Sequence, residues 1–231
     1  MKQLAKSLVI AGALAVAGSA VADFGDINPY IGADFQLTKM KAKAPFDTLV
    51  AKSFPGANLY VGTKFHENFG VEAGYNLSKS QSKTADIAAR FDGVAATGFG
   101  SGAKPGATTK LRRNSAFFDV VGFLPVMDCV ELIGSVGYGY VMPKLSITAA
   151  NGTAVAGYAL KNQSVLRVGL GASYMVTDMV GLRAKLGWEN TKHTHFKNSD
   201  DRKALRANGG ALTTRPLKDS TTLNVGAFVK F

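Results

Sequence analysis

The sequence predicts an all-β fold, an eight-stranded antiparallel up-and-down β-barrel that spans a membrane. Three observations favour it: apolar and polar residues alternate in eight segments, glycine gathers on one face of them, and short and long connections alternate. The composition agrees, because 26 of the 231 residues are glycine and each costs roughly 1 kcal/mol inside a helix. The single cysteine excludes a disulfide framework and a cysteine-rich zinc site.

The start of the chain has the features of a cleaved secretory signal. Two lysines precede an apolar run from 8 to 17, and Ala20 to Ala22 fit the small-residue rule for cleavage. We therefore expect residues 1–22 to be removed and residues 23–231 to form one domain. An uncleaved helical anchor is the alternative, but the apolar run is short for a helix that crosses a bilayer.

Eight later segments alternate between bulky apolar residues and small or polar ones. The fourth is the least regular, because Phe117 and Val121 stand at positions of its polar face. In lipid an open sheet edge has no hydrogen-bond partners, so we expect the last strand to pair with the first. The segments are 31–37, 59–65, 69–77, 115–124, 131–140, 166–174, 180–189 and 223–231.

The glycine-rich face is predicted to point inward. The interior of an eight-stranded barrel is narrow and suits small side chains, whereas bulky aliphatic rows suit contact with lipid. A soluble lipocalin-like barrel is the alternative, with the apolar rows enclosed. Alternating connections favour the transmembrane barrel, which has short turns at one end and long loops at the other. The long connections are expected at about 38–58, 78–114, 141–164 and 190–220.

The segments resemble those of small outer-membrane β-barrels, the family of the transmembrane domain of outer-membrane protein A and the opacity-type surface proteins. The resemblance rests on 69–75, on Gly134 to Tyr140 and on Gly226 to Phe231. It implies a location in the outer membrane of a Gram-negative-type bacterium. It also implies that Phe231 ends a signal read by the barrel-insertion machinery. The chain stops at the last strand, so we expect no domain that tethers it to the cell wall.

Charged residues on the inward face are balanced, five acidic against five basic. Because a lone buried charge is costly, we expect them to pair inside the barrel, with Lys64 diagonal to Glu72 and Arg167 opposite Glu189. The predicted ion-pair network would fill the barrel as a plug. A narrow gated channel for ions or small solutes is the alternative, in which the same charges exchange partners. The ten residues are Asp34, Lys64, Glu72, Asp119, Glu131, Arg167, Arg183, Lys185, Glu189 and Lys230.

The excess positive charge falls in the long loops, which we expect to face the cell exterior. Phosphates of lipopolysaccharide are one expected partner, because a basic residue near an anionic membrane gains about 1 kcal/mol. A glycan or protein of a host surface is another, which would make the chain an adhesin, whereas the location argues against nucleic acid. The predicted outer-loop basic surface consists of Arg112, Arg113, Lys192, Lys197, Arg202, Lys203 and Arg206.

No motif predicts catalysis, a cofactor or a metal site. His193 and His195 lack a third ligand, and no nucleophile elbow accompanies them. The glycine-rich run 98–106 lacks the spacing of a phosphate-binding loop, and Cys129 is a lone thiol at a short turn. We therefore expect a non-enzymatic, monomeric surface protein whose barrel is an anchor and whose loops are the working surface.

Overall fold

The computed structural model describes residues 27–42, 51–85, 107–148, 154–155, 160–190 and 217–231. The predicted signal and its cleavage site after Ala22 lie outside these residues. Within them, no helix is long and apolar enough to cross a membrane. The strands are β1 (Asn28–Ala42), β2 (Ser53–His66), β3 (Phe69–Ser78), β4 (Gln81–Ala85), β5 (Ala107–Met127), β6 (Val130–Thr148), β7 (Ala154–Val155), β8 (Gln163–Met175), β9 (Val180–Glu189) and β10 (Leu217–Lys230).

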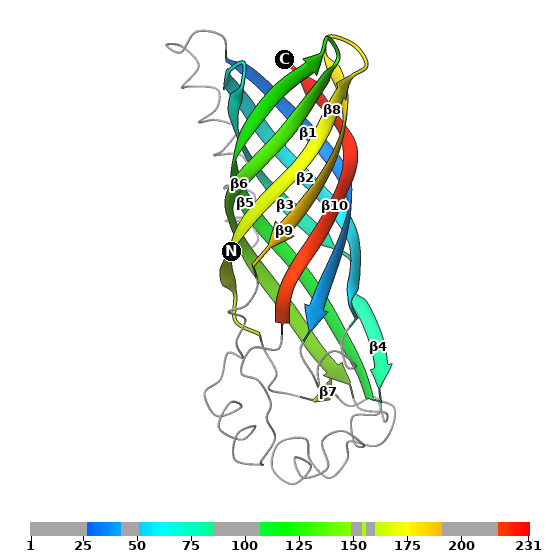
Figure 1. The fold of residues 1–231 in the computed structure, drawn as a ribbon. Coiled ribbons are helices and arrows are strands. Elements are labelled where there is room, and N and C mark those ends of the chain that lie inside the picture. Colours follow the sequence, from blue (N-terminus) through cyan, green and yellow to red (C-terminus); the bar gives the residue numbers. More distant parts are fainter. Residues whose placement is uncertain (1–26, 43–50, 86–106, 149–153, 156–159, 191–216) are drawn as a thin grey trace, which may run out of the picture.

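Eight of these strands close into an antiparallel barrel. The order around the barrel is β5-β3-β2-β1-β10-β9-β8-β6, and β6 pairs again with β5. The last strand lies beside the first, with Ala33 opposite Ala227 and Leu37 opposite Leu223 (Figure 1). The short strands β4 and β7 add only to the margins of β5 and β6. The predicted fold class and its closure are therefore confirmed.

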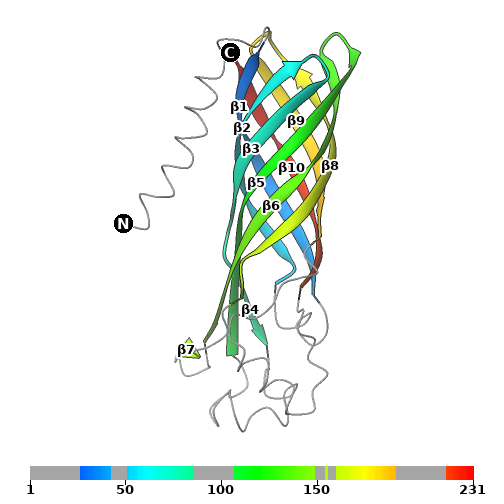
Figure 2. The same cartoon turned by 90° about the vertical axis from the view of Figure 1, so that its left-hand side faces the viewer.

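The two ends of the barrel differ (Figure 2). At one end, which we call the short-turn end, tight turns join β2 to β3, β5 to β6 and β8 to β9. We call the opposite end the long-loop end. There β5 and β6 reach lengths of 21 and 19 residues, well past the ends predicted for them. The expected connections 78–114 and 141–164 were therefore too long, because outward residues beyond the lipid are polar and give no apolar alternation.

Exposure of the side chains identifies the face that meets lipid. Leu170 is 74% exposed and Val225 is 49% exposed, whereas Arg183 is 4% exposed and Glu72 only 1%. Bulky apolar rows thus face outward and the charged rows face inward. A soluble barrel would have the reverse arrangement, so the lipocalin-like alternative is wrong.

Glycines on the inner wall make room for aromatic rings. Tyr30 lies directly across from Gly62, and Tyr60 lies directly across from Gly32 on the same pair of strands. A Cβ atom at either glycine would collide with the facing tyrosine ring. The two tyrosine rings belong to a larger apolar layer inside the barrel, toward the short-turn end. Its members are Tyr30, Tyr60, Phe117, Val121, Phe123, Ile133 and Phe228.

Candidate functional site

A continuous chain of alternating charges crosses the interior beside the apolar layer. Each member except the two ends contacts two residues of opposite charge, so four bases and four acids neutralise one another. We call this group the ion-pair chain. Its order is Arg113, Glu189, Arg167, Asp119, Lys185, Glu72, Arg183 and Asp34.

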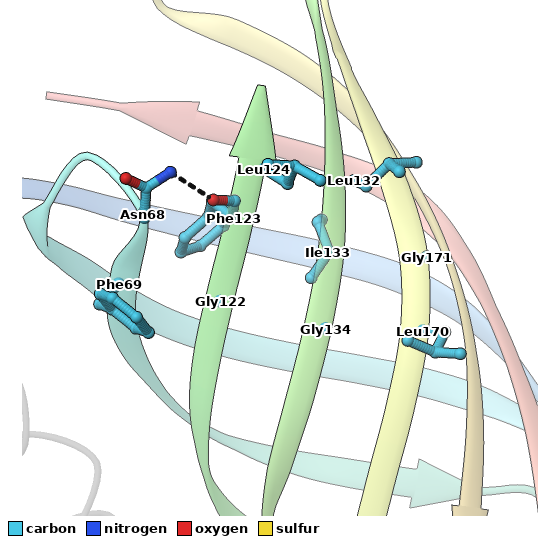
Figure 3. A pocket seen from close by; sticks show the side chains of 10 residues that line it. All are labelled: Asn68, Phe69, Gly122, Phe123, Leu124, Leu132, Ile133, Gly134, Leu170 and Gly171. Carbon is cyan, nitrogen blue, oxygen red and sulfur yellow. Dashed lines mark hydrogen bonds between the residues drawn. The ribbon is translucent and has the colours of Figure 1, made fainter. Parts of the chain in front are cut away.

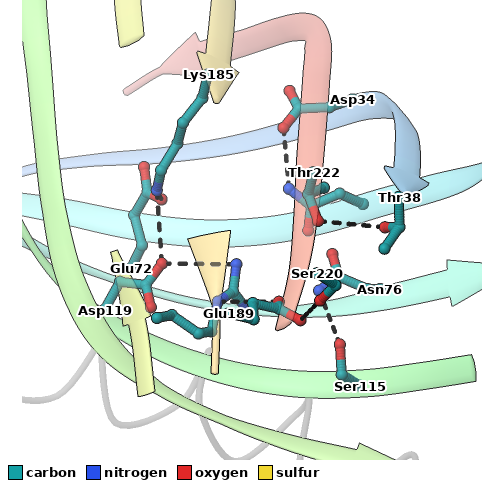
Figure 4. A network of polar contacts seen from close by, with 12 residues as sticks. Asp34, Thr38, Glu72, Asn76, Ser115, Asp119, Lys185, Glu189, Ser220 and Thr222 are labelled. Atoms are coloured by element: carbon teal, nitrogen blue, oxygen red, sulfur yellow. Dashed lines mark hydrogen bonds and ion pairs between the residues drawn. The ribbon is translucent and has the colours of Figure 1, made fainter. Parts of the chain in front are cut away.

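Strands on different sides of the barrel supply the ion-pair chain. Arg183 and Lys185 on β9 both reach Glu72 on β3, with nitrogen–oxygen distances of 2.5 Å and 3.6 Å. Lys185 also lies 3.5 Å from Asp119 on β5 (Figure 4). Arg183 and Lys185 occupy successive inward positions of β9, because side chains alternate between the two faces of a β-strand. Together they connect β9 to β3 and β5.

Neutral groups hold the acids of the ion-pair chain in place. The hydroxyl of Tyr30 donates to Glu72 at 3.0 Å, and the amide of Asn58 donates to Asp34 at 2.9 Å. The guanidinium of Arg183 also stacks over the Tyr60 ring, 3.5 Å from its centroid. A buried ion pair is favourable only when such hydrogen bonds compensate for lost water. The arrangement thus fixes the positions of the charges inside the barrel.

Eight of the ten charges predicted for the interior are buried, and Glu131 and Lys230 are half-buried. Arg167 lies opposite Glu189, as expected, and its Nε is 3.5 Å from Glu189 Oε1. Lys64, in contrast, contacts Glu131 at 2.5 Å near the short-turn end, not Glu72. Lys230 forms no ion pair within the described part of the chain.

Arg113 requires a correction. We expected this residue in the outer-loop basic surface, but it lies in β5, is 4% exposed and pairs with Glu189 inside the barrel. The alternation already present at Ser115 and Asp119 places Arg113 on the inward face two residues earlier. Continuing that alternation past residue 115 would have found it, and the same reasoning applies to Tyr30 and Tyr60.

Three basic residues form a cluster on the outward face toward the long-loop end. Arg112 on β5 is directly opposite Lys144 on β6, and Lys110 is the next outward residue of β5. All three are exposed, and neither strand has an outward acid among its described residues. Arg112 Nε donates to Asn114 Oδ1 at 3.2 Å, which orients the guanidinium. We call Lys110, Arg112 and Lys144 the basic cluster.

Several other predicted residues lie outside the described part of the chain. These are Lys192, Lys197, Arg202, Lys203 and Arg206, together with His193, His195 and the glycine-rich run 98–106. Phe231 is described: its backbone N–H donates to Pro29 at 3.0 Å and its side chain is 73% exposed. Among the described residues, no group of three or more histidine, cysteine or acidic side chains is arranged to hold a metal ion.

Comparisons with known proteins agree with this architecture. The family described as outer membrane protein beta-barrel domain matches residues 8–231. A major outer membrane protein from Thermus thermophilus is 15% identical, with a TM-score of 0.57 over 89% of this chain and 100% of that one. Ail from Yersinia pestis is 13% identical (TM-score 0.50, 89% and 99%), and Neisserial surface protein A is 16% identical (TM-score 0.50, 88% and 97%). No curated protein sequence matches the chain significantly.

Proposed function

The chain belongs to the outer membrane protein β-barrel family, and on that premise we propose a surface protein whose barrel is a closed anchor and whose long-loop end binds anionic polysaccharide or lipid. In this proposal the long-loop end faces the cell exterior, because bacterial barrels have short periplasmic turns and longer extracellular loops. The proposed role is non-enzymatic.

The filled interior supports the role of an anchor. The ion-pair chain and the apolar layer both occupy the barrel, and their largest members are almost completely buried. Eight strands leave an interior that side chains can fill, whereas water-filled sieving pores use about 16 to 18 strands. A wide pore is therefore not the function that we propose.

The basic cluster is the observation that carries the binding proposal. Like charges directly opposite each other on neighbouring strands destabilise a sheet, yet Arg112 and Lys144 occupy such a pair. A sulfate or phosphate group between them would relieve the repulsion through charge-assisted hydrogen bonds. Ail, which shares this fold, was crystallised with the heparin analogue sucrose octasulfate. For the present chain we propose the same chemical class, a sulfated or phosphorylated glycan or lipid.

Heparin binding in lipid nanodiscs free of lipopolysaccharide tests this proposal. We expect K110Q/R112Q/K144Q to bind heparin fragments at least about tenfold more weakly, because charge-assisted contacts of this kind contribute about 1.5–3 kcal/mol each when well formed. The matched control is K39Q/K41Q/K52Q, which removes three other exposed lysines. Equal losses of heparin affinity in both variants would indicate a general attraction to positive charge. Unchanged affinity in K110Q/R112Q/K144Q would reject the basic cluster as the binding site.

Lipopolysaccharide added to the same nanodiscs distinguishes the two sources of anion. If lipid phosphates occupy the basic cluster, heparin and lipopolysaccharide will compete for it, and K110Q/R112Q/K144Q will weaken both. If only glycans of another cell bind there, lipopolysaccharide will leave heparin binding unchanged.

A narrow gated channel remains the second candidate, because part of the inner wall is polar and incompletely bonded. The side-chain oxygens Asn58 Oδ1, Asn76 Oδ1 and Asn224 Oδ1 are buried and have no hydrogen-bond partner among the described residues. Buried polar groups of this kind usually bind water, so water inside the barrel is a starting point for ion movement. Potassium flux from loaded vesicles tests this candidate directly.

A further inference from the structure

Two glycines on the lipid-facing wall have no partner ring and no steric requirement for glycine. Gly122 on β5 and Gly134 on β6 lie directly opposite each other and point outward. Every other glycine of the described strands stands at an inward position. A Cβ atom at Gly122 or Gly134 would meet no atom closer than 3.9 Å, so packing within the barrel does not explain them.

The missing side chains leave a groove in the outer wall (Figure 3). Phe69 and Leu170 flank the two glycines within one cross-strand row. Leu124 and Leu132 border the glycines toward the short-turn end. Two hollows of about 760 Å³ and 750 Å³ share Phe69, Gly122, Gly134 and Leu170 and so form a single groove.

The groove runs obliquely from the short-turn end toward the middle of the barrel. It begins at Asn68 and Phe69, beside the turn between β2 and β3, and reaches Trp188 near the far end of β9. The path from β3 to β9 crosses four interstrand spacings, a distance of roughly 19 Å. Its lining side chains are almost all hydrocarbon, so its occupant must be apolar and elongated.

An acidic residue stands where the groove reaches the short-turn end. Glu67 directly precedes Asn68, which lines the groove. Its side chain is exposed. The nearby lysines, Lys64 and Lys230, are at inward positions, so they do not face this surface. A cationic group is therefore favoured beside the mouth of the groove.

We propose that the groove binds one acyl chain of a phospholipid whose headgroup carries an ammonium, with the ammonium beside Glu67. Under the orientation given in the proposed function, this lipid belongs to the inner leaflet, since the short-turn end is periplasmic. The apolar lining selects the hydrocarbon chain, and Glu67 selects the headgroup. The glycan-binding proposal concerns the opposite end of the barrel and is independent of this site.

Trp188 reports on the occupant, because it is the single tryptophan of the chain and lines the far end of the groove. The protein is reconstituted into vesicles of phosphatidylethanolamine and phosphatidylglycerol, with bromine on the acyl chains of one lipid or of the other. The lipid composition is then the same in both preparations, which differ only in the lipid that carries the bromine. We expect brominated phosphatidylethanolamine to quench Trp188 roughly two- to fivefold more effectively, as an exposed ion pair would give. Both leaflets have the same composition, so the result does not depend on orientation.

Three variants separate the parts of the site. G122L/G134L fills the groove and should abolish the preference, whereas A33L/A227L places the same two leucine side chains at an outward alanine pair elsewhere on the barrel and should retain it. E67Q changes only an exposed turn and should lose the headgroup preference while quenching continues. Equal quenching by both lipids in the unmodified protein would overturn the proposal. So would a preference that survives G122L/G134L, or weak quenching by both lipids with cross-linked dimers, which would identify a second copy as the occupant.

Discussion

Arg183 on β9 donates a hydrogen bond of 2.5 Å to Glu72 on β3, and these two strands are farthest apart in the ring of eight. The order β3-β2-β1-β10-β9 places them four steps apart on one side, and β3-β5-β6-β8-β9 does so on the other. The contact therefore crosses the full width of the barrel. Both side chains are buried, so this ion pair links opposite walls inside the barrel.

A double-mutant cycle measures this contact. Replacing Glu72 by Gln or Arg183 by Met removes one of the two opposite charges that the other residue contacts and leaves the buried charges unbalanced, so each change should lower the free energy of unfolding by about 3–5 kcal/mol. The combined variant E72Q/R183M should lose clearly less than the sum, since the two residues interact directly. Denaturant titration in vesicles gives the values. Lys230→Gln, which removes a half-buried charge without a described ion pair, is the control, and additive losses would contradict a direct coupling.

Inward and outward glycines should respond oppositely to a methyl group. Gly62→Ala places a Cβ against the Tyr30 ring and should destabilise the barrel by about 1–3 kcal/mol, the usual cost of overpacking. Gly122→Ala meets open space and should be neutral or slightly stabilising, because alanine suits a strand better than glycine. The same unfolding titration compares them. Equal effects would show that the tyrosine–glycine pairing does not determine the inner wall.

The unmodified protein should give no stable large conductance in planar bilayers. R183A/K185A removes two of the four bases in the ion-pair chain and leaves its four acids with a net negative charge. We expect this variant to show small cation-selective currents, provided that it folds. Large non-selective openings of the unmodified protein would contradict a barrel that its own side chains fill.

Salt should weaken binding of an anionic glycan at the basic cluster. The Debye length falls from about 10 Å at 0.1 M to about 3 Å at 1 M ionic strength, so attraction between exposed charges is largely screened. Heparin affinity measured across this range should fall steadily, and the fall should be shallower for K110Q/R112Q/K144Q. Binding that persists unchanged at 1 M salt would indicate a contact of another kind.

Alternation along the strands was sufficient to predict the fold and most of the interior. Glu72, Arg167 and Arg183 were assigned inward because period-two alternation ties each residue to a face. Partners were harder to predict, since they depend on which strands face each other across the barrel. Lys64 could thus be placed inside, but its contact with Glu131 required the strand order and stagger.

The ends of the strands were least predictable. Past the lipid, water surrounds the outward face, so Lys110 and Arg112 look like loop residues although they lie within β5. Arg113 was misassigned for that reason and belongs to the ion-pair chain. The groove at Gly122 and Gly134 was also missed, because a glycine in the sequence gives no sign of which face it occupies until the alternation around it is followed.

Neighbouring residues of β10 test most directly which face meets lipid. Asn224 is 4% exposed and Val225 is 49% exposed, although they are adjacent in the chain. With Cys129 replaced by serine, a polarity-sensitive fluorophore is attached at Val225→Cys or at Asn224→Cys. At Val225 we predict strong quenching by brominated lipid and little by iodide, and at Asn224 little quenching by lipid. Lipid quenching at Asn224 with none at Val225 would contradict the assignment of the two faces.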